Sequence, residues 1–233
     1  MTPLENITKQ LQSLGRAAAA EQAQRFFKTG PGQYGEGDIF LGIRVPVLRT
    51  VAKEYDPVAL NTAVELLQSP FHEVRLLALL ILVRQYQRGG REAEIYRAYL
   101  GNTHRINNWD LVDSSAEQIV GVHLFKRSRK PLIKLASSQC LWERRIAIVA
   151  TFHFIRKNQF DDTLALADIL LKDSEDLLHK AVGWMLREVG KRDLKIEEDF
   201  LLPRYKTMPR TMLRYAIERF PELRRRAYLN GTL

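Results

Sequence analysis

A repeat of about 35 residues constrains this chain more than any other feature of the sequence. An apolar segment begins at each of five charged residues, with successive spacings of 35, 35, 35 and 34 residues: Arg75, Asp110, Arg145, Lys180 and Arg214. Repeats of this length are single supersecondary units that bury a continuous core only by stacking on their neighbours. The sequence therefore predicts a stacked array, with one charged position recurring beside an apolar stripe.

The elements of this array are predicted to be helices. Apolar residues recur at spacings of three and four, and almost no stretch alternates as a strand would. Breaks between helices are expected at turn-forming residues, namely Gly30 to Gly37, Asp56-Pro57, Ser69-Pro70, Gly89-Gly90, Asn107-Asn108, Ser137-Ser138, Asp173-Ser174, Met208-Pro209 and Phe220-Pro221.

From about residue 45 onward, the unit is a helical hairpin close in length to both tetratricopeptide and HEAT-type repeats. The tetratricopeptide pattern of Trp, Leu-Gly and Tyr is missing. We therefore expect an all-α, HEAT-like helical repeat solenoid. It would form a single domain over residues 1–233, with a helical N-terminal cap at residues 1–44.

The charge balance favours a polyanionic partner. Lysine and arginine number 36 against 27 acidic residues, which gives a net charge of +9. A charge of this sign attracts nucleic acid through its field and through counterion release. The alternative is a basic soluble protein with no such partner. With the recurring basic position, the charge predicts one long, positively lined surface.

Several classes of protein are excluded by composition. Cys140 is the single cysteine, so an internal disulfide or a Cys-rich metal site is excluded, and the histidines show no metal-ligand spacing. The longest apolar run, Leu76 to Val83, is far shorter than the roughly 20 residues needed to cross a bilayer. The N-terminus lacks the layout of a signal peptide. We expect a monomeric cytoplasmic protein without metal or membrane association.

One glycine-rich string imitates a nucleotide-binding motif. Gly30-Pro-Gly-Gln-Tyr-Gly35 reads as GxGxxG, which cradles a pyrophosphate when it follows a strand and opens a helix. The segment before it, Ala17 to Lys28, is alanine-rich and is predicted to be helical. The glycines are therefore expected to form a loop.

An acidic residue interrupts the apolar pattern of the repeat. Asp113 lies three residues after the charged position, where the other repeats have Ala78, Ile148 and Ile217. Trp109 lies four residues before Asp113, so the two side chains share a helix face. A carboxylate at such a position requires a cationic or hydrogen-bonding partner, and Arg145 in the next repeat is a candidate.

Two further residues fall on the same stripe, Trp184 and Arg187. We expect the stripe residues Trp109, Asp113, Arg145, Trp184 and Arg187 to converge on one inner surface. The residues alone leave two interpretations open. Asp113 could bridge neighbouring helices beside two core indoles, or the indoles could flank the carboxylate in a cation-binding pocket.

At these residues the chain resembles the AlkD family of DNA alkylation repair enzymes, which are HEAT-like DNA glycosylases for alkylated purines. The resemblance covers most of residues 20 to 220. It rests on four strings: Phe40-Leu-Gly-Ile-Arg-Val-Pro46, Asn108-Trp-Asp-Leu-Val-Asp113, Trp142-Glu-Arg-Arg145-Ile-Ala, and Lys180-Ala-Val-Gly-Trp-Met-Leu-Arg-Glu188. The second and fourth strings are specific in their order and spacing.

The resemblance implies a concave basic groove that binds DNA, and it implies roles for individual residues. Asp113 matches the catalytic aspartate of the family, Trp109 and Trp184 match the aromatic walls, and Arg145 matches an arginine beside the backbone of the lesion. Family members often carry a second aromatic residue where this chain has Asn108. The basic residues expected to contact DNA are Arg187, Lys180, Arg144, Arg75 and Arg214.

The function implied is hydrolysis of the N-glycosidic bond of cationic N3- or N7-alkylated purines in duplex DNA. The product is an abasic site, as in base excision repair, and no cofactor is expected. When bound to DNA, the protein would associate with the nucleoid. Two alternatives share the fold: a non-catalytic HEAT-like protein that binds DNA structures, and a protein-binding scaffold.

Overall fold

The structure is a computed structural model that describes residues 2–233, and the chain packs as two compact units. The first unit ends at Ile119 and the second comprises Val120–Leu233. Because each repeat of an array contacts only its neighbours, two compact units are compatible with one array. The expectation of a single domain stays a prediction, and each unit is described by itself.

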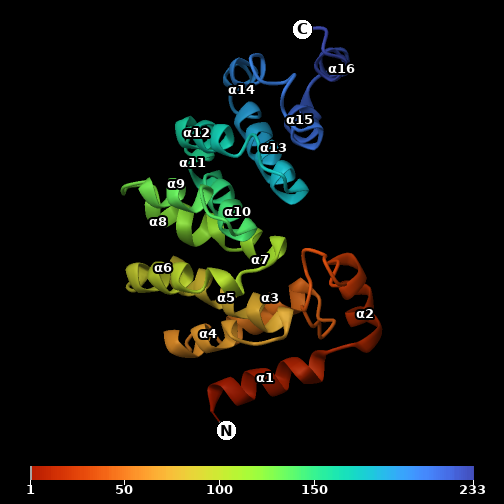
Figure 1. Cartoon of the computed structure of the whole chain (residues 1–233). Coiled ribbons are helices and arrows are strands. Elements are labelled where there is room, and N and C mark those ends of the chain that lie inside the picture. The colour runs from red at the N-terminus through yellow and green to blue at the C-terminus, as the bar shows by residue number, and fades with distance from the viewer. Residues whose placement is uncertain (1) are drawn as a thin grey trace. The chain divides into compact units, whose positions relative to one another are not determined.

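The first unit contains seven α-helices and one short 3₁₀ helix (Figure 1): α1 (Pro3–Leu14), α2 (Ala17–Phe26), α3 (Val45–Glu54), α4 (Leu60–Leu67), α5 (His72–Arg88), α6 (Glu92–Gly101), η1 (Thr103–Arg105) and α7 (Trp109–Asp113). α5 is the central helix of this unit. It packs against α3, α4, α6 and α7, and nearly every residue from His72 to Val83 is buried.

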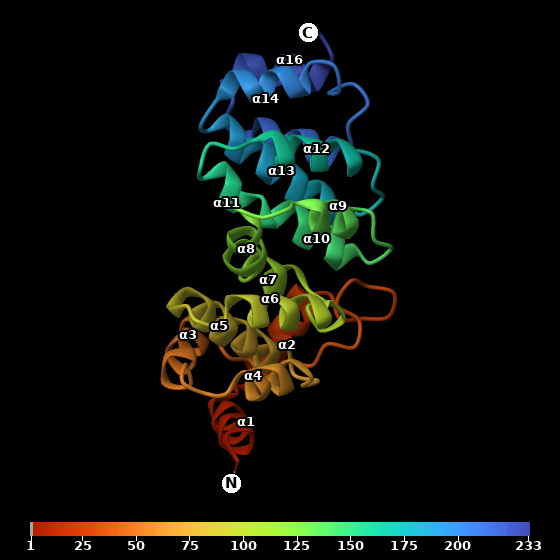
Figure 2. The same ribbon diagram turned by 90° about the vertical axis from the view of Figure 1, so that its left-hand side faces the viewer.

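A π-helical turn, η2 (Glu117–Gly121), follows α7 and leads into the helices of the second unit. These are α8 (Val122–Leu124), α9 (Lys130–Ala136), α10 (Leu141–Ala150), α11 (Phe152–Ile155), α12 (Asp161–Ile169), α13 (Asp176–Gly190), α14 (Leu194–Leu201), α15 (Arg210–Ala216), η3 (Ile217–Arg219) and α16 (Glu222–Asn230). Figure 2 shows the pairs α9–α10 and α12–α13 as successive layers, and α13 also packs on α14 and α15.

The all-α prediction is confirmed for residues 2–233. The described residues contain one isolated bridge, between Ile39 and Phe71, and no strand. Every predicted break falls between two helices, and the GxGxxG string lies in a loop. No helix among the described residues is long and apolar enough to span a membrane.

Two local expectations require correction. The N-terminal cap is helical only to Phe26, and residues 27–44 form a loop in which Phe27 stacks on Phe40. The segment that opens at Asp110 is not a long apolar helix like its counterparts, because α7 ends after five residues. Met1 of the predicted cap lies outside the described residues.

The phase of the repeat agrees with the helices. The charged position is the fifth residue of its helix in three cases: Arg145 in α10, Lys180 in α13 and Arg214 in α15. In α5 it is the fourth residue, Arg75. The positions three or four residues later are buried as predicted, namely Ala78, Leu79, Ile148, Val149 and Ile217.

Two glycines in the strings quoted above permit close backbone contacts. Gly42 has a φ of 79°, which disfavours other residues, and a β-carbon there would lie 2.3 Å from the carbonyl oxygen of Arg16. A β-carbon on Gly183 would lie 2.4 Å from the carbonyl oxygen of Met212. Gly42 thus lets the loop pass against α2, and Gly183 lets α13 approach α15.

Candidate active site

The short helix α7 carries two of the predicted site residues, Trp109 and Asp113. The helix begins at Trp109 because the preceding residue, Asn108, acts as its N-cap: the Asn108 side chain accepts a hydrogen bond of 2.8 Å from the Trp109 backbone N–H. The Asn108 side chain is fully buried and also donates to Asp38 at 3.2 Å. A second aromatic side chain at this position could make neither contact.

Asp113 lines a cleft of about 410 Å³ within the first unit. Its carboxyl group is partly exposed, and Arg49 and Lys53 of α3 line the same cleft together with Arg84 of α5. Arg84 pairs with Asp56 at 3.5 Å. Arg49 and Lys53 are exposed and form no ion pair with any of residues 2–233. The cleft therefore places a carboxylate beside two cations that can accept an anionic ligand.

Sequence reasoning missed Arg49 and Lys53 as site residues. Both precede Arg75, the first residue aligned in the repeat, so the stripe did not include them. Their spacing of four residues on a helix with exposed basic positions was the available signal, because such residues share one helix face.

Trp109 belongs to an aromatic cluster that the sequence did not predict. Its indole stacks on Phe27 with ring centroids 5.4 Å apart, and Phe26 approaches it edge-on at 6.1 Å. Phe27 in turn stacks on Phe40 at 5.0 Å. Phe26 is 63% exposed, so the cluster reaches the surface. Trp109 is half-buried and is part of a wall that extends through the loop at residues 27–44 to the end of α2.

A buried network of charged side chains and one amide lies beneath this wall. We call it the Asp38 network, and its members are Asp38, His72, Arg75, Asn108 and Asp110. His72 lies between two carboxylates, with Nδ1 3.0 Å from Asp38 and Nε2 2.8 Å from Asp110. Arg75 donates to the other oxygen of Asp38 at 2.5 Å. Two carboxylates and two cationic side chains thus balance one another in the interior.

The network shifts the pKa values of its members. Burial would lower the pKa of His72, but hydrogen bonds and charge from Asp110 and Asp38 outweigh burial and raise this pKa to about 9. Burial would raise the pKa of Asp38, yet the hydrogen bond from His72 and the charge of Arg75 hold this pKa below its ordinary value. His72 is therefore cationic at neutral pH, and the Asp38 carboxylate beside it is ionised.

Arg75 is fixed inside this network. It is 2% exposed, and its guanidinium donates to the backbone carbonyls of Ser69 and Pro70 as well as to Asp38. A DNA phosphate would have to displace these buried bonds. The geometry therefore gives Arg75 a structural role, and its contact with DNA stays a prediction.

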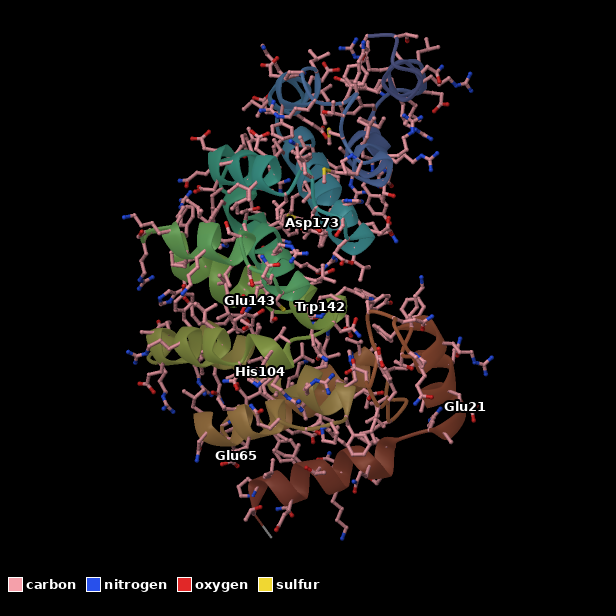
Figure 3. All side chains as sticks on the ribbon, in the orientation of Figure 1. Glu21, Glu65, His104, Trp142, Glu143 and Asp173 are labelled. Atoms are coloured by element: carbon pink, nitrogen blue, oxygen red, sulfur yellow. The ribbon has the colours of Figure 1, made fainter. Side chains whose placement is uncertain are left out.

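In the second unit, α10 carries the neighbouring residues Arg144 and Arg145. Arg144 forms a two-point pair with Asp173, with its Nε 2.6 Å from Oδ2; Asp173 lies in the turn between α12 and α13 (Figure 3). Arg145 is 5% exposed and donates to the backbone carbonyl of Leu177. Both arginines tie α10 to the beginning of α13.

The remaining predicted residues of this unit differ in exposure and in whether they already have a charged partner. Trp184 is half-buried on α13, edge-on to Phe152 at 5.6 Å. Arg187 forms an ion pair with Glu218, and Lys180 forms one with Asp176 at 2.7 Å. Arg214 is exposed on α15 and forms no ion pair with another described residue. Arg214 is thus readily available to an anionic partner, whereas Arg187 and Lys180 would have to exchange partners.

Trp109 and Asp113 belong to the first unit, and Arg145, Trp184 and Arg187 belong to the second. Their convergence on one surface stays a prediction, and so does the concave basic groove. Among residues 2–233 no group of three or more His, Cys, Asp or Glu side chains could hold a metal ion.

The helical fold and the cleft lined by Asp113 define a class of protein in which a carboxylate lies beside unpaired cations, as suits a polyanionic ligand. A family model described as DNA alkylation repair enzyme matches residues 7–220. The chain therefore belongs to the DNA alkylation repair enzyme family. A search of curated proteins found no match.

Three solved structures share the fold. A predicted DNA alkylation repair enzyme from Enterococcus faecalis superposes with a TM-score of 0.69 at 19% identity, covering 89% of this chain and 97% of that chain. AlkD2 from Streptococcus mutans gives 0.59 at 16% identity, covering 88% and 98%. The protein smu.31 from Streptococcus mutans UA159 gives 0.57 at 16% identity, covering 95% and 100%.

Proposed function

We propose that this protein is a monofunctional DNA glycosylase that releases cationic N3- or N7-alkylated purines from duplex DNA. The observation that carries the proposal is the position of Asp113, partly exposed in a cleft that also contains the unpaired cations Arg49 and Lys53. Membership of the DNA alkylation repair enzyme family supports it.

The chemistry requires few protein groups. Alkylation at N3 or N7 gives the purine a positive charge, so the base leaves as a neutral molecule without an acid to protonate it. Rupture of the bond between C1′ and the base nitrogen leaves an oxocarbenium-like sugar. The carboxylate of Asp113 would stabilise this cation and orient a water molecule. The water adds to C1′ and loses a proton, which leaves an abasic site.

The aromatic and basic residues would hold the substrate around Asp113. Trp109 and Trp184 would pack against the deoxyribose and favour its developing positive charge. Arg145 would lie beside the backbone of the lesion, as the family resemblance implies, and Arg49 and Lys53 would bind phosphates next to the attacked sugar. Phosphate contacts of this kind fix the register of a protein on DNA.

Further contacts with the DNA backbone are assigned to four side chains of the second unit: Arg144, Lys180, Arg187 and Arg214. Arg214 needs no rearrangement, whereas the other three would exchange acidic partners for phosphates. We further propose that the protein acts as a cytoplasmic monomer, associated with the nucleoid while bound to DNA.

Incubation with a duplex that contains one N7-methylguanine tests the proposal. Alkaline treatment would cut the strand at an abasic site, and the expected result is cleavage at the lesion above the spontaneous background. Binding of the duplex without cleavage would instead support the non-catalytic DNA-binding alternative. Absence of both would exclude a nucleic-acid function.

A further inference from the structure

We propose that the His72 side chain, bridging Asp38 and Asp110 as a cation, positions α7 and therefore sets the orientation of Trp109 and Asp113. His72 is thus a positioning residue for the reaction, and it does not itself touch the substrate. The catalytic consequence of this inference rests on the proposed function. The hydrogen-bonded link from Asp38 through His72 to Asp110, which we call the tie, can be tested without any reaction.

The length of α7 makes it dependent on such a tie. Its five residues form little more than one turn, and a single turn is not stable by its own hydrogen bonds. Ser114 and Ser115 then form a turn that separates α7 from the helical residues Ala116 to Gly121. Because this turn interrupts the helix, we expect contacts with the interior to contribute to the position of α7.

The contacts that hold the beginning of α7 converge on Asp38. This carboxylate accepts hydrogen bonds from His72 and from the side chains of Asn107 and Asn108, which immediately precede the helix. His72 then extends the chain of bonds to Asp110, the second residue of α7. Among residues 2–233, the Asp110 carboxylate otherwise accepts a hydrogen bond only from its own neighbour, the Leu111 backbone N–H.

The tie requires a charged imidazole for a geometric reason. Each ring nitrogen of His72 lies within 3.0 Å of a carboxylate oxygen. A neutral imidazole has one N–H donor, so its second nitrogen would present a lone pair to an oxygen that also has only lone pairs. Loss of the proton must break one of the two bonds. The pKa of about 9 places this loss at alkaline pH.

The other charged groups around His72 come from four elements. Asp38 belongs to the loop at residues 27–44, Asp110 to α7, and Arg75 to α5 itself. Arg105 of η1 acts on Arg75 through its charge. Glu73, the neighbour of His72, is occupied by the backbone N–H groups of Leu41, Gly42 and Ile43. None of these groups could replace His72 as a bridge to Asp110.

The tie can be measured directly by NMR titration of the wild-type protein from pH 6 to pH 10. The expected result is that the imidazole of His72 loses its proton near pH 9 and that the indole N–H signal of Trp109 shifts with the same midpoint. A neutral His72 at pH 7 would overturn the proposal. So would a Trp109 signal that stays constant while His72 titrates.

The catalytic consequence is tested with His72→Gln, because glutamine can donate a hydrogen bond to one carboxylate but cannot bridge two as a cation. Displacement of reacting groups by about 1 Å can cost about 100-fold in rate, so we expect single-turnover excision to fall by about 10- to 100-fold. Binding of undamaged duplex should be unchanged. His104→Gln is the matched control, since His104 is exposed on η1 (Figure 3).

The wild-type rate should also fall above pH 9 after subtraction of spontaneous base loss, and the folded His72→Gln variant should lack this fall. A folded His72→Gln variant with the wild-type rate and pH profile would overturn the proposal. If this variant does not fold, the wild-type titration and rate profile decide. If the wild type excises nothing, the proposed function fails. The joint titration of His72 and Trp109 still tests whether His72 positions α7.

Discussion

The indole of Trp109 stacks on the ring of Phe27, with centroids 5.4 Å apart and ring planes 22° apart. One face of Trp109 is therefore covered by the protein, and the side chain as a whole is only half-buried. This arrangement suits a wall of a groove better than a position in the core.

The first prediction concerns Trp109→Ala. Truncation of a fully buried aromatic residue costs about 3–5 kcal/mol, and we expect a smaller loss at Trp109 together with a strong loss of excision. Trp142→Ala is the comparison, because Trp142 is 8% exposed and should show the full cost. Urea unfolding and single-turnover excision measure the two effects. Equal destabilisation by both changes would assign Trp109 to the core.

The second prediction concerns Asp113→Asn, which preserves shape but removes the negative charge. Excision of N7-methylguanine at saturating enzyme should fall by about 10²- to 10³-fold, because a preorganised electrostatic partner of the transition state is lost. DNA affinity should hold or rise, since one repulsion with phosphate disappears. Excision at the wild-type single-turnover rate would remove Asp113 from the mechanism.

The third prediction concerns the two unpaired cations of the cleft. Neutralisation of one phosphate contact changes the slope of log affinity against log salt by about 0.9. Arg49→Gln and Lys53→Gln should each reduce the slope by about this amount. Lys9→Gln, which removes an exposed charge from α1, should leave it unchanged. If all three variants alter the slope alike, the cleft is no preferred phosphate site.

The fourth prediction concerns Glu197 of α14, which is 1% exposed and has an Oε1 atom without a hydrogen-bond partner. Burial, assisted by the charge of Glu198, raises the pKa of Glu197 to about 9. In the folded state, Glu197 thus keeps its proton up to about pH 9. In the unfolded chain, it loses the proton in the ordinary glutamate range near pH 4. The free energy of unfolding should therefore fall as pH rises through this window, by up to about 1.4 kcal/mol per pH unit.

Glu197→Gln should remove the part of this dependence that Glu197 causes, because the amide does not titrate, whereas the fall above about pH 6.5 that the raised pKa of His72 causes should remain. The variant should become progressively more stable than the wild type between pH 5 and pH 8.5, as measured by urea unfolding. Glu65→Gln on α4 changes an exposed carboxylate and should reproduce the wild-type profile (Figure 3). A wild-type stability that is constant over this range would contradict the raised pKa of Glu197.

The sequence predicted the helical architecture well because its signals are local. Turn-forming residues marked every predicted break, and the repeat located the buried positions that follow Arg75 and Arg145. The contacts at the start of α7 were not predicted, because Asn108 and Asp110 form hydrogen bonds with residues far away in the sequence. These contacts, and not helix propensity, determine how α7 begins.

The candidate site was predictable in part. Asp113 was found because a carboxylate interrupts an apolar pattern, and Trp109 because four residues separate it from Asp113. The burial of Arg75 was not predicted, since a sequence by itself does not distinguish a basic residue on a surface from one that neutralises a buried carboxylate. Phe27 was missed because its stacking on Trp109 joins segments about 80 residues apart in the chain.

The hydrogen bond between Asn108 and Asp38 also has a consequence for the order of folding. It joins residues that are 70 positions apart, so it forms only after a large loop has been closed, and such non-local contacts form slowly. Contacts within the α4–α5 hairpin are far more local. We expect α5 to gain protection from hydrogen exchange before α7 in a pulse-labelled refolding experiment, and the reverse order would contradict this. The segment that bears Asp113 would then be among the last parts of the first unit to become native.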